Sequence, residues 1–279
     1  MANSYPIGKI FNIPVRVHVT LLIFLPLFAL SFAPAAGLQG LLYGLLFAVG
    51  LFGCVVLHEL GHSLVARAKG ARILEILLLP IGGMARLERM PTKPIDEIQT
   101  ALAGPAVSLA LGIVAWWFAP VAALVNRNLG LLLANLGGFN IMLAFFNLIP
   151  SFPMDGGRVF RAVLTPRLGR VAATKLAAKV GRGIAWIFGA LAILPLFQGG
   201  TINFSLLLIA YFVHQSAGAE ARQAEAEAAY IRQRTQMNGA FQIPDADVHV
   251  SPPPYARPTR PDPRAAAHGL FDDLFNKWR

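Results

Sequence analysis

Four long stretches of this sequence contain no Asp, Glu, Lys or Arg, and they constrain the fold more than any other feature. They cover residues 17–58, 98–126, 128–154 and 183–219. A helix that crosses the ~30 Å hydrocarbon core of a bilayer needs about 20 apolar residues. Because 56% of all residues are hydrophobic and only 14% are charged, an ordinary soluble domain is excluded. The sequence predicts an integral membrane protein.

Division of these stretches into segments of about 20 residues predicts an all-α polytopic fold with six transmembrane helices. The predicted spans are residues 17–35, 41–65, 98–120, 129–149, 176–197 and 202–217. The first of them resembles a signal peptide, but the segment before it is long and only modestly basic, which favours an uncleaved span.

The basic residues indicate how the spans are oriented. Lys and Arg number 2 before the first span, 6 in residues 66–97, 7 in residues 156–182 and 8 from residue 218 onward, and only Arg127 lies elsewhere. Because cytoplasmic loops are rich in Lys and Arg, both termini and the two basic loops are expected in the cytoplasm. The net charge of +10 indicates a membrane surface and no nucleic acid, since no aromatic-interleaved basic stripe accompanies it.

Two segments outside the spans have patterns of their own. Residues 73–87 contain an apolar run, a Pro-Ile-Gly-Gly sequence and a second short run, which predicts a membrane-associated β-hairpin, with a plain cytoplasmic loop as the alternative. The expected organisation is a six-span domain over residues 1–217, an exposed cytoplasmic helix over 218–242, and a Pro-rich, largely disordered tail over 243–279. The last residues of the tail fit a short amphipathic helix or a frayed end.

The motif His58-Glu59-Leu60-Gly61-His62 lies inside the second predicted span. Two histidines four residues apart project from one helix face and can bind one ion, with the adjacent glutamate as a candidate base. In this chemistry zinc lowers the pKa of bound water, and the glutamate accepts the water's proton as it attacks a carbonyl. Chance predicts only about 0.003 such motifs at this composition. The motif therefore predicts a metal-dependent hydrolytic site.

Asp155 is the acidic residue best placed to complete this site, because a catalytic zinc takes three protein ligands and a water. It is the only acid adjoining the charge-free fourth span, and Glu59 is the only acid inside any span. Two prolines precede Asp155 and two glycines follow it, so the segment cannot remain a regular helix. Such backbone at membrane depth is tolerated where it is buried or lines a wet cavity. A loop with an exposed aspartate is the alternative.

The depth of the site and one further catalytic candidate follow from neighbouring residues. His58 lies nine residues, or ~13 Å, before Arg67 along the helix axis, which predicts an active site in the cytoplasmic half of the bilayer. Asn147 could donate its amide to the oxyanion or to substrate backbone, with a helix-end hydrogen bond as the alternative.

His18 and His214 lie at span edges and are expected to be structural. The single cysteine, Cys54, is expected to be a small buried residue.

These motifs resemble the site-2 protease family, polytopic zinc metalloproteases of peptidase family M50 that cut transmembrane segments of other proteins. The resemblance rests on the motif at residues 58–62 and on the segment from Asn147 through Pro153-Met154-Asp155-Gly156-Gly157, with supporting patches at residues 79–83 and 101–105. It implies one zinc ion bound by His58, His62 and Asp155, with Glu59 activating water and Asn147 assisting.

The resemblance also implies a substrate class. The partners would be the lipid bilayer and a single-pass transmembrane protein, such as an anti-sigma factor or a similar membrane-tethered regulator, cut by regulated intramembrane proteolysis. The inserted PDZ domain and the C-terminal CBS pair of some relatives have no counterpart in this sequence. The alternatives are a catalytically inactive relative that binds membrane helices, and a membrane metal transporter, against which the intact Glu59 and the absence of a His-rich loop argue.

Overall fold

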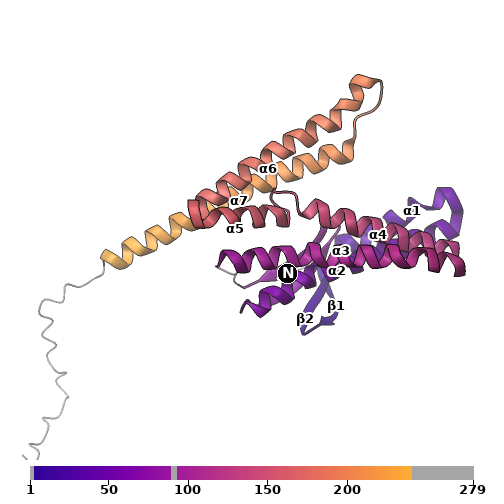
Figure 1. The fold of residues 1–279 in the computed structure, drawn as a ribbon, viewed down its shortest axis with the longest axis horizontal. Helices are drawn as coiled ribbons and strands as arrows, with labels where there is room; N and C mark the ends of the chain where they lie inside the picture. Colours follow the sequence, from indigo (N-terminus) through magenta and orange to yellow (C-terminus); the bar gives the residue numbers. More distant parts are fainter. Residues whose placement is uncertain (1–2, 89–92, 241–279) are drawn as a thin grey trace, which may run out of the picture. The chain divides into compact units, whose positions relative to one another are not determined.

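The computed structural model describes residues 3–88 and 93–240. The chain divides into two units, Met1–Arg232 and Gln233–Arg279. The predicted tail over 243–279 lies outside the described residues. In chain order the elements are β1 (Ser4–Ile10), β2 (Ile13–His18), α1 (Val19–Leu30), α2 (Ala33–Ala68), β3 (Ile73–Leu79), β4 (Gly82–Leu87), α3 (Pro94–Val125), α4 (Arg127–Asn147), α5 (Asp155–Leu168), α6 (Arg170–Ile193), η1 (Leu194–Gln198) and α7 (Phe204–Ala240) (Figure 1).

Four helical segments in the described part of the chain are long and apolar enough to cross a membrane. They are Gly37–Ala68 in α2, Pro94–Val125 in α3, Arg127–Asn147 in α4, and Arg170–Phe197 in α6 and η1. The chain is therefore a multi-pass membrane protein, and four of the six predicted spans are confirmed as candidate spans. The first and last predicted spans stay predictions, because α1 is apolar but has only 12 residues and α7 is not among the four.

Several predicted boundaries differ from the observed ones. The predicted span over residues 17–35 begins in β2, and its helix ends at Leu30, where the Ser31 hydroxyl donates to the carbonyl of Phe28. At the other end, the predicted sixth span and the predicted exposed helix form one continuous helix, α7. The Ala-, Glu- and Gln-rich sequence after residue 217 has high helix propensity, so nothing interrupts the helix there.

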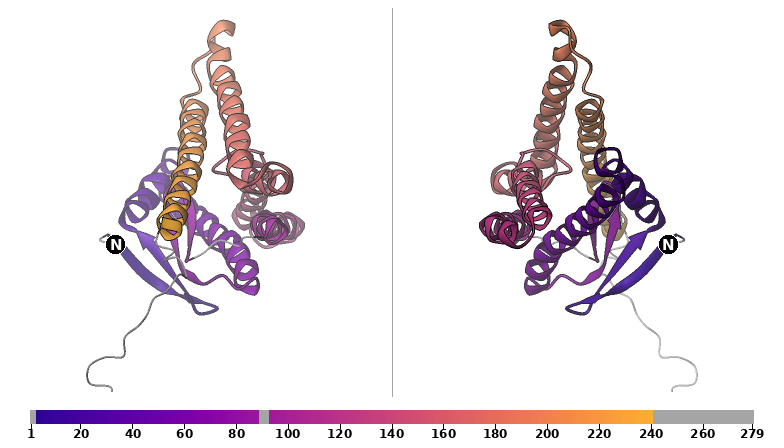
Figure 2. Two further views of the ribbon diagram at one scale, coloured as in Figure 1. Left: turned by 90° about the vertical axis from the view of Figure 1, so that its left-hand side faces the viewer. Right: turned by 90° about the vertical axis from the view of Figure 1, so that its right-hand side faces the viewer.

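The β-structure is more extensive than the predicted hairpin. The hairpin over residues 73–87 is confirmed as β3 and β4, but a second hairpin, β1–β2, joins it to form one sheet in the order β1-β2-β3-β4. The predicted fold is thus confirmed as mostly helical, with a four-stranded sheet in place of a single hairpin. Strand β2 pairs parallel with β3, and its alternate residues Val15 and Val17 form a buried cluster with Leu21 of α1, Val56 of α2 and Leu78 of β3. Figure 2 shows the β1–β2 hairpin projecting from one side of the helices.

Helices α3 and α4 approach each other closely through small residues. A Cβ atom added to Gly112 would lie 2.6 Å from Ile141 Cγ1, and one added to Gly137 would lie 2.8 Å from Trp116 Cδ1 and 3.0 Å from the Gly112 carbonyl oxygen. Small residues at such crossings are common between transmembrane helices because apolar side chains alone give little preference over lipid. The α3–α4 pair is therefore packed backbone against backbone.

Helices α6 and α7 pack in an antiparallel hairpin. A Cβ atom added to Gly181 would lie 3.4 Å from Ala217 Cβ, and one added to Gly189 would lie 4.0 Å from Ala210 Cβ. The two contacts run in opposite chain directions, so α7 returns along α6 after η1. Ala177, Ala178 and Ala217 are completely buried in this contact together with Phe152.

The close α3–α4 contact gives a testable difference between two neighbouring glycines. Gly137→Ala should lower the thermal unfolding midpoint of the purified protein in detergent, because overpacking typically costs about 1–3 kcal/mol. Gly138→Ala should leave the midpoint unchanged or raise it, because no atom lies within 4 Å of a Cβ added there and alanine is the better helix former. Equal shifts for the two variants would contradict the close approach.

Candidate metal centre and active site

His58 and His62 lie one turn apart on α2 and are almost completely buried, with exposed fractions of 4% and 7%. Their ring centroids are 4.7 Å apart. The residue between them that permits this burial is Gly61, where an added Cβ would lie 2.9 Å from the carbonyl oxygen of Ala103. The glycine therefore lets α3 approach the face of α2 that carries both imidazoles.

Asp155 meets the two histidines from a different part of the chain. It is the first residue of α5 and is also buried, with 7% exposed. Its Oδ2 atom lies 3.4 Å from His58 Nε2 and 3.1 Å from His62 Nε2. The ligand atoms of the three residues all lie within 4.8 Å of one another. These three side chains, which the sequence analysis predicted as metal ligands, thus form a group that could hold a metal ion.

Helix α3 orients both imidazole rings through their Nδ1 atoms. His62 Nδ1 lies 2.7 Å from the carbonyl oxygen of Thr100, and His58 Nδ1 lies 2.9 Å from Ser108 Oγ. A carbonyl can only accept, so His62 Nδ1 carries a proton and donates it. In the neutral ring, Nε2 then has the lone pair that a metal ion binds. Hydrogen bonding of this kind is the usual way that proteins orient metal-binding histidines.

The donor set fits a metal ion. With neutral rings, the two Nε2 atoms, 3.1 Å apart, and the Asp155 carboxylate direct lone pairs toward one point, an arrangement that suits a cation. Two imidazoles and one carboxylate are a ligand set of catalytic zinc sites that keep a position open for water. Space for an ion is provided by Gly104 of α3, since a Cβ atom there would overlap the Nε2 atoms of both histidines.

The predicted interruption before Asp155 is observed. Helix α4 ends at Asn147, and residues 148–154 form a non-helical loop before α5. Added Cβ atoms on Gly156 and Gly157 would collide with loop backbone at Leu148 and Ser151. The two glycines therefore let the loop fold back against the first turn of α5, which carries Asp155 into the protein interior.

Glu59 is half-buried beside the edge strand of the sheet. Its Oε2 atom accepts a hydrogen bond of 3.1 Å from the backbone N–H of Ala85 in β4. A Cβ atom added to Gly83 would lie 2.5 Å from Glu59 Cγ, so this glycine allows β4 to approach the glutamate. Strand β4 pairs on one side with β3, and its other edge carries the N–H that binds Glu59.

The remaining predicted residues lie outside the group of three. Asn147 is the half-buried last residue of α4, and the contacts of the described residues include none that joins its side chain to the histidines or Asp155. His18 accepts from the backbone N–H of Thr20 and caps α1. His214 packs edge-on against Trp186 at 5.9 Å. Both contacts are of the structural kind expected for these histidines.

Sequence reasoning missed the residues of α3 that surround the imidazoles. Gly104 lies within the 101–105 patch that carries part of the family resemblance, but its contact with the histidines was not foreseen. Ser108 and Thr100 have no motif of their own. Their signal is helical spacing, since Thr100, Gly104 and Ser108 follow one another at intervals of four and share one face of α3.

Comparisons with known proteins identify the family of this chain. The sequence model of peptidase family M50 matches residues 46–135 and 120–188. A zinc metalloprotease of Methanocaldococcus jannaschii is 38% identical over 253 residues, which are 89% of this chain and 70% of that protein. A Synechocystis protein, provisionally named a zinc metalloprotease, is 36% identical over 266 residues. These residues are 90% of this chain and 66% of that protein.

A solved structure is similar as well. The site-2 protease from Methanocaldococcus jannaschii matches with a TM-score of 0.57 and 35% identity, covering 78% of this chain and 95% of that one. Fold and donor set together define a membrane-bound metallopeptidase whose cofactor is zinc. The chain belongs to peptidase family M50, the site-2 protease family, and is a metalloendopeptidase.

Gly104 allows a direct test of the metal centre. Gly104→Ala should abolish stoichiometric zinc binding, because the added methyl group would occupy the space between the two Nε2 atoms. Zinc content is measured by metal analysis of protein purified in detergent. Gly53→Ala on α2 is the matched control, because no atom lies within 4 Å of a Cβ added there, and it should retain zinc. A Gly104→Ala protein with one zinc per chain would contradict the proposed location.

Proposed function

We propose that this chain is an intramembrane endopeptidase that hydrolyses a peptide bond in or near the transmembrane segment of single-pass membrane proteins. The observation that carries the proposal is the buried group of His58, His62 and Asp155. Two of its members lie within Gly37–Ala68, a helix long and apolar enough to span a membrane. Ionisable residues inside such helices are costly and mark functional sites.

His58, His62 and Asp155 would hold the zinc ion, and the chain's own residues prepare the reaction around it. The chemistry that zinc would supply when held by these residues is a lowered pKa of a coordinated water and polarisation of the substrate carbonyl. Thr100 and Ser108 hold the two imidazoles in place by their hydrogen bonds, and burial excludes bulk solvent from the group. Pre-oriented polar groups of this kind need no rearrangement during the reaction.

Glu59 is the proposed general base. It follows His58 directly on α2, and the Ala85 N–H fixes one carboxylate oxygen, which leaves the other oxygen available to accept a proton from the attacking water. The same position suits proton transfer to the leaving amine. Asn147, at the end of the helix that leads into the Asp155 loop, is proposed to assist the oxyanion or to hold substrate backbone.

The substrate is proposed to bind as an extended strand beside β4. Helical carbonyls are hydrogen-bonded and shielded, so a transmembrane helix must unwind locally before it is cut. The edge of β4 that does not pair with β3 could bind such a segment by β-addition, and Gly83 permits close approach next to Glu59. This arrangement would present a peptide bond to the glutamate and the metal group.

The proposed topology has six spans with both termini in the cytoplasm. Helix α1 packs against α2 through the rings of Phe28 and Phe47, whose centroids are 6.1 Å apart, and α7 returns along α6. If α1 and α7 both cross, the basic loops over 66–97 and 156–182 lie on the side of the termini, as the positive-inside rule requires. The metal group then lies in the cytoplasmic half of the bilayer.

The catalytic assignment is tested with purified protein in detergent and single-pass membrane proteins as substrates. Glu59→Gln should retain zinc but lose about 10²–10⁴-fold in cleavage rate, as expected for a general base. Asp155→Ala should lose both zinc and cleavage. Glu88→Gln, which changes an exposed acid paired with Arg72, is the control and should cleave normally. Unchanged cleavage by Glu59→Gln would exclude this mechanism, and wild-type protein that holds zinc without cutting would favour the inactive alternative.

The topology is tested with reporter fusions. A fluorescent protein that folds only in the cytoplasm should fluoresce when fused to the C-terminus. Alkaline phosphatase, which is active only outside the cytoplasm, should be active when fused after Arg127, the first residue of α4. If α1 does not cross the membrane, Arg127 lies on the same side as the N-terminus, so phosphatase inactive at this position would contradict six spans.

A further inference from the structure

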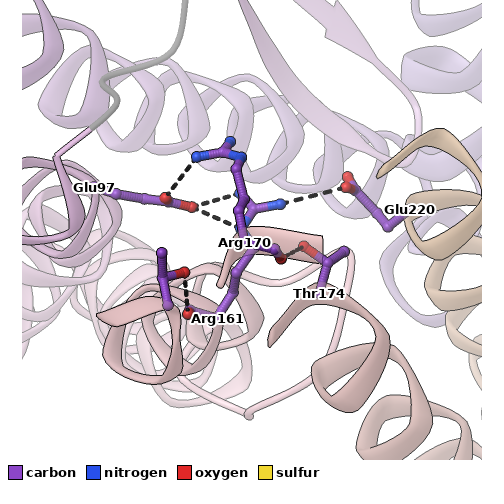
Figure 3. A network of polar contacts seen from close by, with 6 residues as sticks. Glu97, Arg161, Arg170, Thr174 and Glu220 are labelled. Carbon is purple, nitrogen blue, oxygen red and sulfur yellow. Dashed lines mark hydrogen bonds and ion pairs between the residues drawn. The ribbon is translucent and has the colours of Figure 1, made fainter. Parts of the chain in front are cut away.

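A network of ion pairs with a buried centre joins α3, α5, α6 and α7 and includes none of the residues of the metal group (Figure 3). Glu97 of α3 and Arg161 of α5 form its centre, and each is only 7% exposed. Arg161 donates from both Nε, at 2.8 Å, and Nη2 to Glu97 Oε1. Arg170 of α6 approaches the other Glu97 oxygen at 3.4 Å, and Glu220 of α7 lies 3.7 Å from Arg161 Nη1. Two acids and two arginines balance in charge.

Glu97 belongs to the same stretch of α3 that holds the histidines. It lies one turn before Thr100, whose carbonyl orients His62, and two turns before Gly104, which lies against both imidazoles. Helical spacing places Glu97 and Gly104 on one face, and all three residues are buried. Because one helix carries all three residues, the position of Glu97 fixes the positions of the groups that contact the imidazole rings.

Arg161 lies on the same helix as Asp155, so its position fixes that of Asp155. It lies on α5 six residues after Asp155, a rise of ~9 Å along the helix. Its guanidinium lies 5.2 Å from the ring centroid of Phe152, which is completely buried in the loop before Asp155. Arg161 thus contacts the segments on both sides of Asp155 and connects them to α3.

The physical cost of this pair indicates what it does. Removing two charges from water is expensive, and a buried ion pair seldom stabilises a fold better than apolar residues of similar size. Its effect is specific, because any other alignment of α5 and α3 would leave a buried charge without its partner. Two hydrogen bonds from one planar guanidinium also fix orientation as well as distance.

We propose that Glu97 and Arg161 are positioning residues that fix Asp155 at the distance from His58 and His62 that zinc binding requires. The inference rests on the proposed role of these three residues as zinc ligands. The pair acts through α5 and α3. Arg161 fixes the position of the first turn of α5, which carries Asp155, and its ion pair with Glu97 fixes that turn relative to α3, the helix that orients the imidazoles.

The experiment compares Glu97→Gln with Asp96→Asn in full-length protein purified in detergent. Asp96 is the matched control because it adjoins Glu97 in the first turn of α3 and is ion-paired with Lys69 at 3.1 Å, outside the network. Zinc affinity is measured by competition with a chromophoric chelator, and the cobalt-loaded protein is examined by visible absorption. Glu97→Gln should bind zinc about 10–100-fold more weakly, as found when groups that orient metal ligands are lost, with an altered cobalt spectrum.

Asp96→Asn should keep the affinity and the cobalt spectrum of the wild type. Arg161→Met should reproduce the loss seen in Glu97→Gln, and the double variant should be no weaker than the worse single one, since the two residues act as one unit. If Arg161→Met does not fold, Arg161→Lys replaces it: lysine keeps the charge but lacks the planar guanidinium whose two N–H groups converge on Glu97 Oε1, so the spectrum should still change. Unfolding midpoints of the metal-free proteins identify variants that have only lost stability.

The outcomes separate this inference from the metal centre itself. If wild-type protein binds no stoichiometric zinc, or Asp155→Asn binds it as tightly as the wild type, the proposed ligand set is wrong. If Asp155→Asn loses zinc while Glu97→Gln and Asp96→Asn both bind it normally, the ligand set stands and the positioning role is overturned. Equal losses in Glu97→Gln and Asp96→Asn would also overturn it, because the effect would belong to the end of α3 in general.

Discussion

The convergence of two imidazole nitrogens and a carboxylate oxygen within 4.8 Å of one another is the constraint on which the rest of the structure depends. Lone pairs directed at one point repel each other unless a cation lies between them, and buried polar groups are costly without partners. The surrounding residues meet both demands. Thr100 and Ser108 bind the outward nitrogens of the rings, and Gly104 leaves the inner space free. The metal group is thus a property of α3 as much as of the motif on α2.

The site must also admit substrate backbone and water although it lies among apolar helices. Unpaired backbone groups are tolerated in a membrane only where protein or a wet cavity covers them. The interruption between α4 and α5 meets this condition, because Gly156 and Gly157 let the loop pack against the helix start and because Phe152 in that loop is fully buried. Asp155 therefore approaches the histidines from the first turn of α5, at the positive end of the helix dipole.

The parts of this arrangement that sequence could predict are those encoded within a few residues. Four-residue spacing on a helix determines that His58 and His62 share a face, and prolines and glycines around Asp155 determine that the helix breaks. The β1–β2 hairpin was missed although residues 13–18 alternate between buried and half-buried positions, because the long apolar stretch that follows suggested a span already begun. Parallel pairing of β2 with β3 joins segments about sixty residues apart, and nothing local specifies it.

The partners of the metal group were unpredictable for a related reason. Which side chains of α3 face α2 depends on the rotation of the helix, and its apolar residues are distributed around its whole surface, as in a helix that meets both lipid and protein. Polar and small residues carry the missing information: Glu97, Thr100, Gly104, Ser108 and Gly112 are all buried and lie at intervals of three or four. In an apolar helix, this stripe marks the face turned toward the protein. Along α3 it contacts α5, then the two imidazoles of α2, then α4, so one helix face sets the relative positions of the three helices that build and support the site.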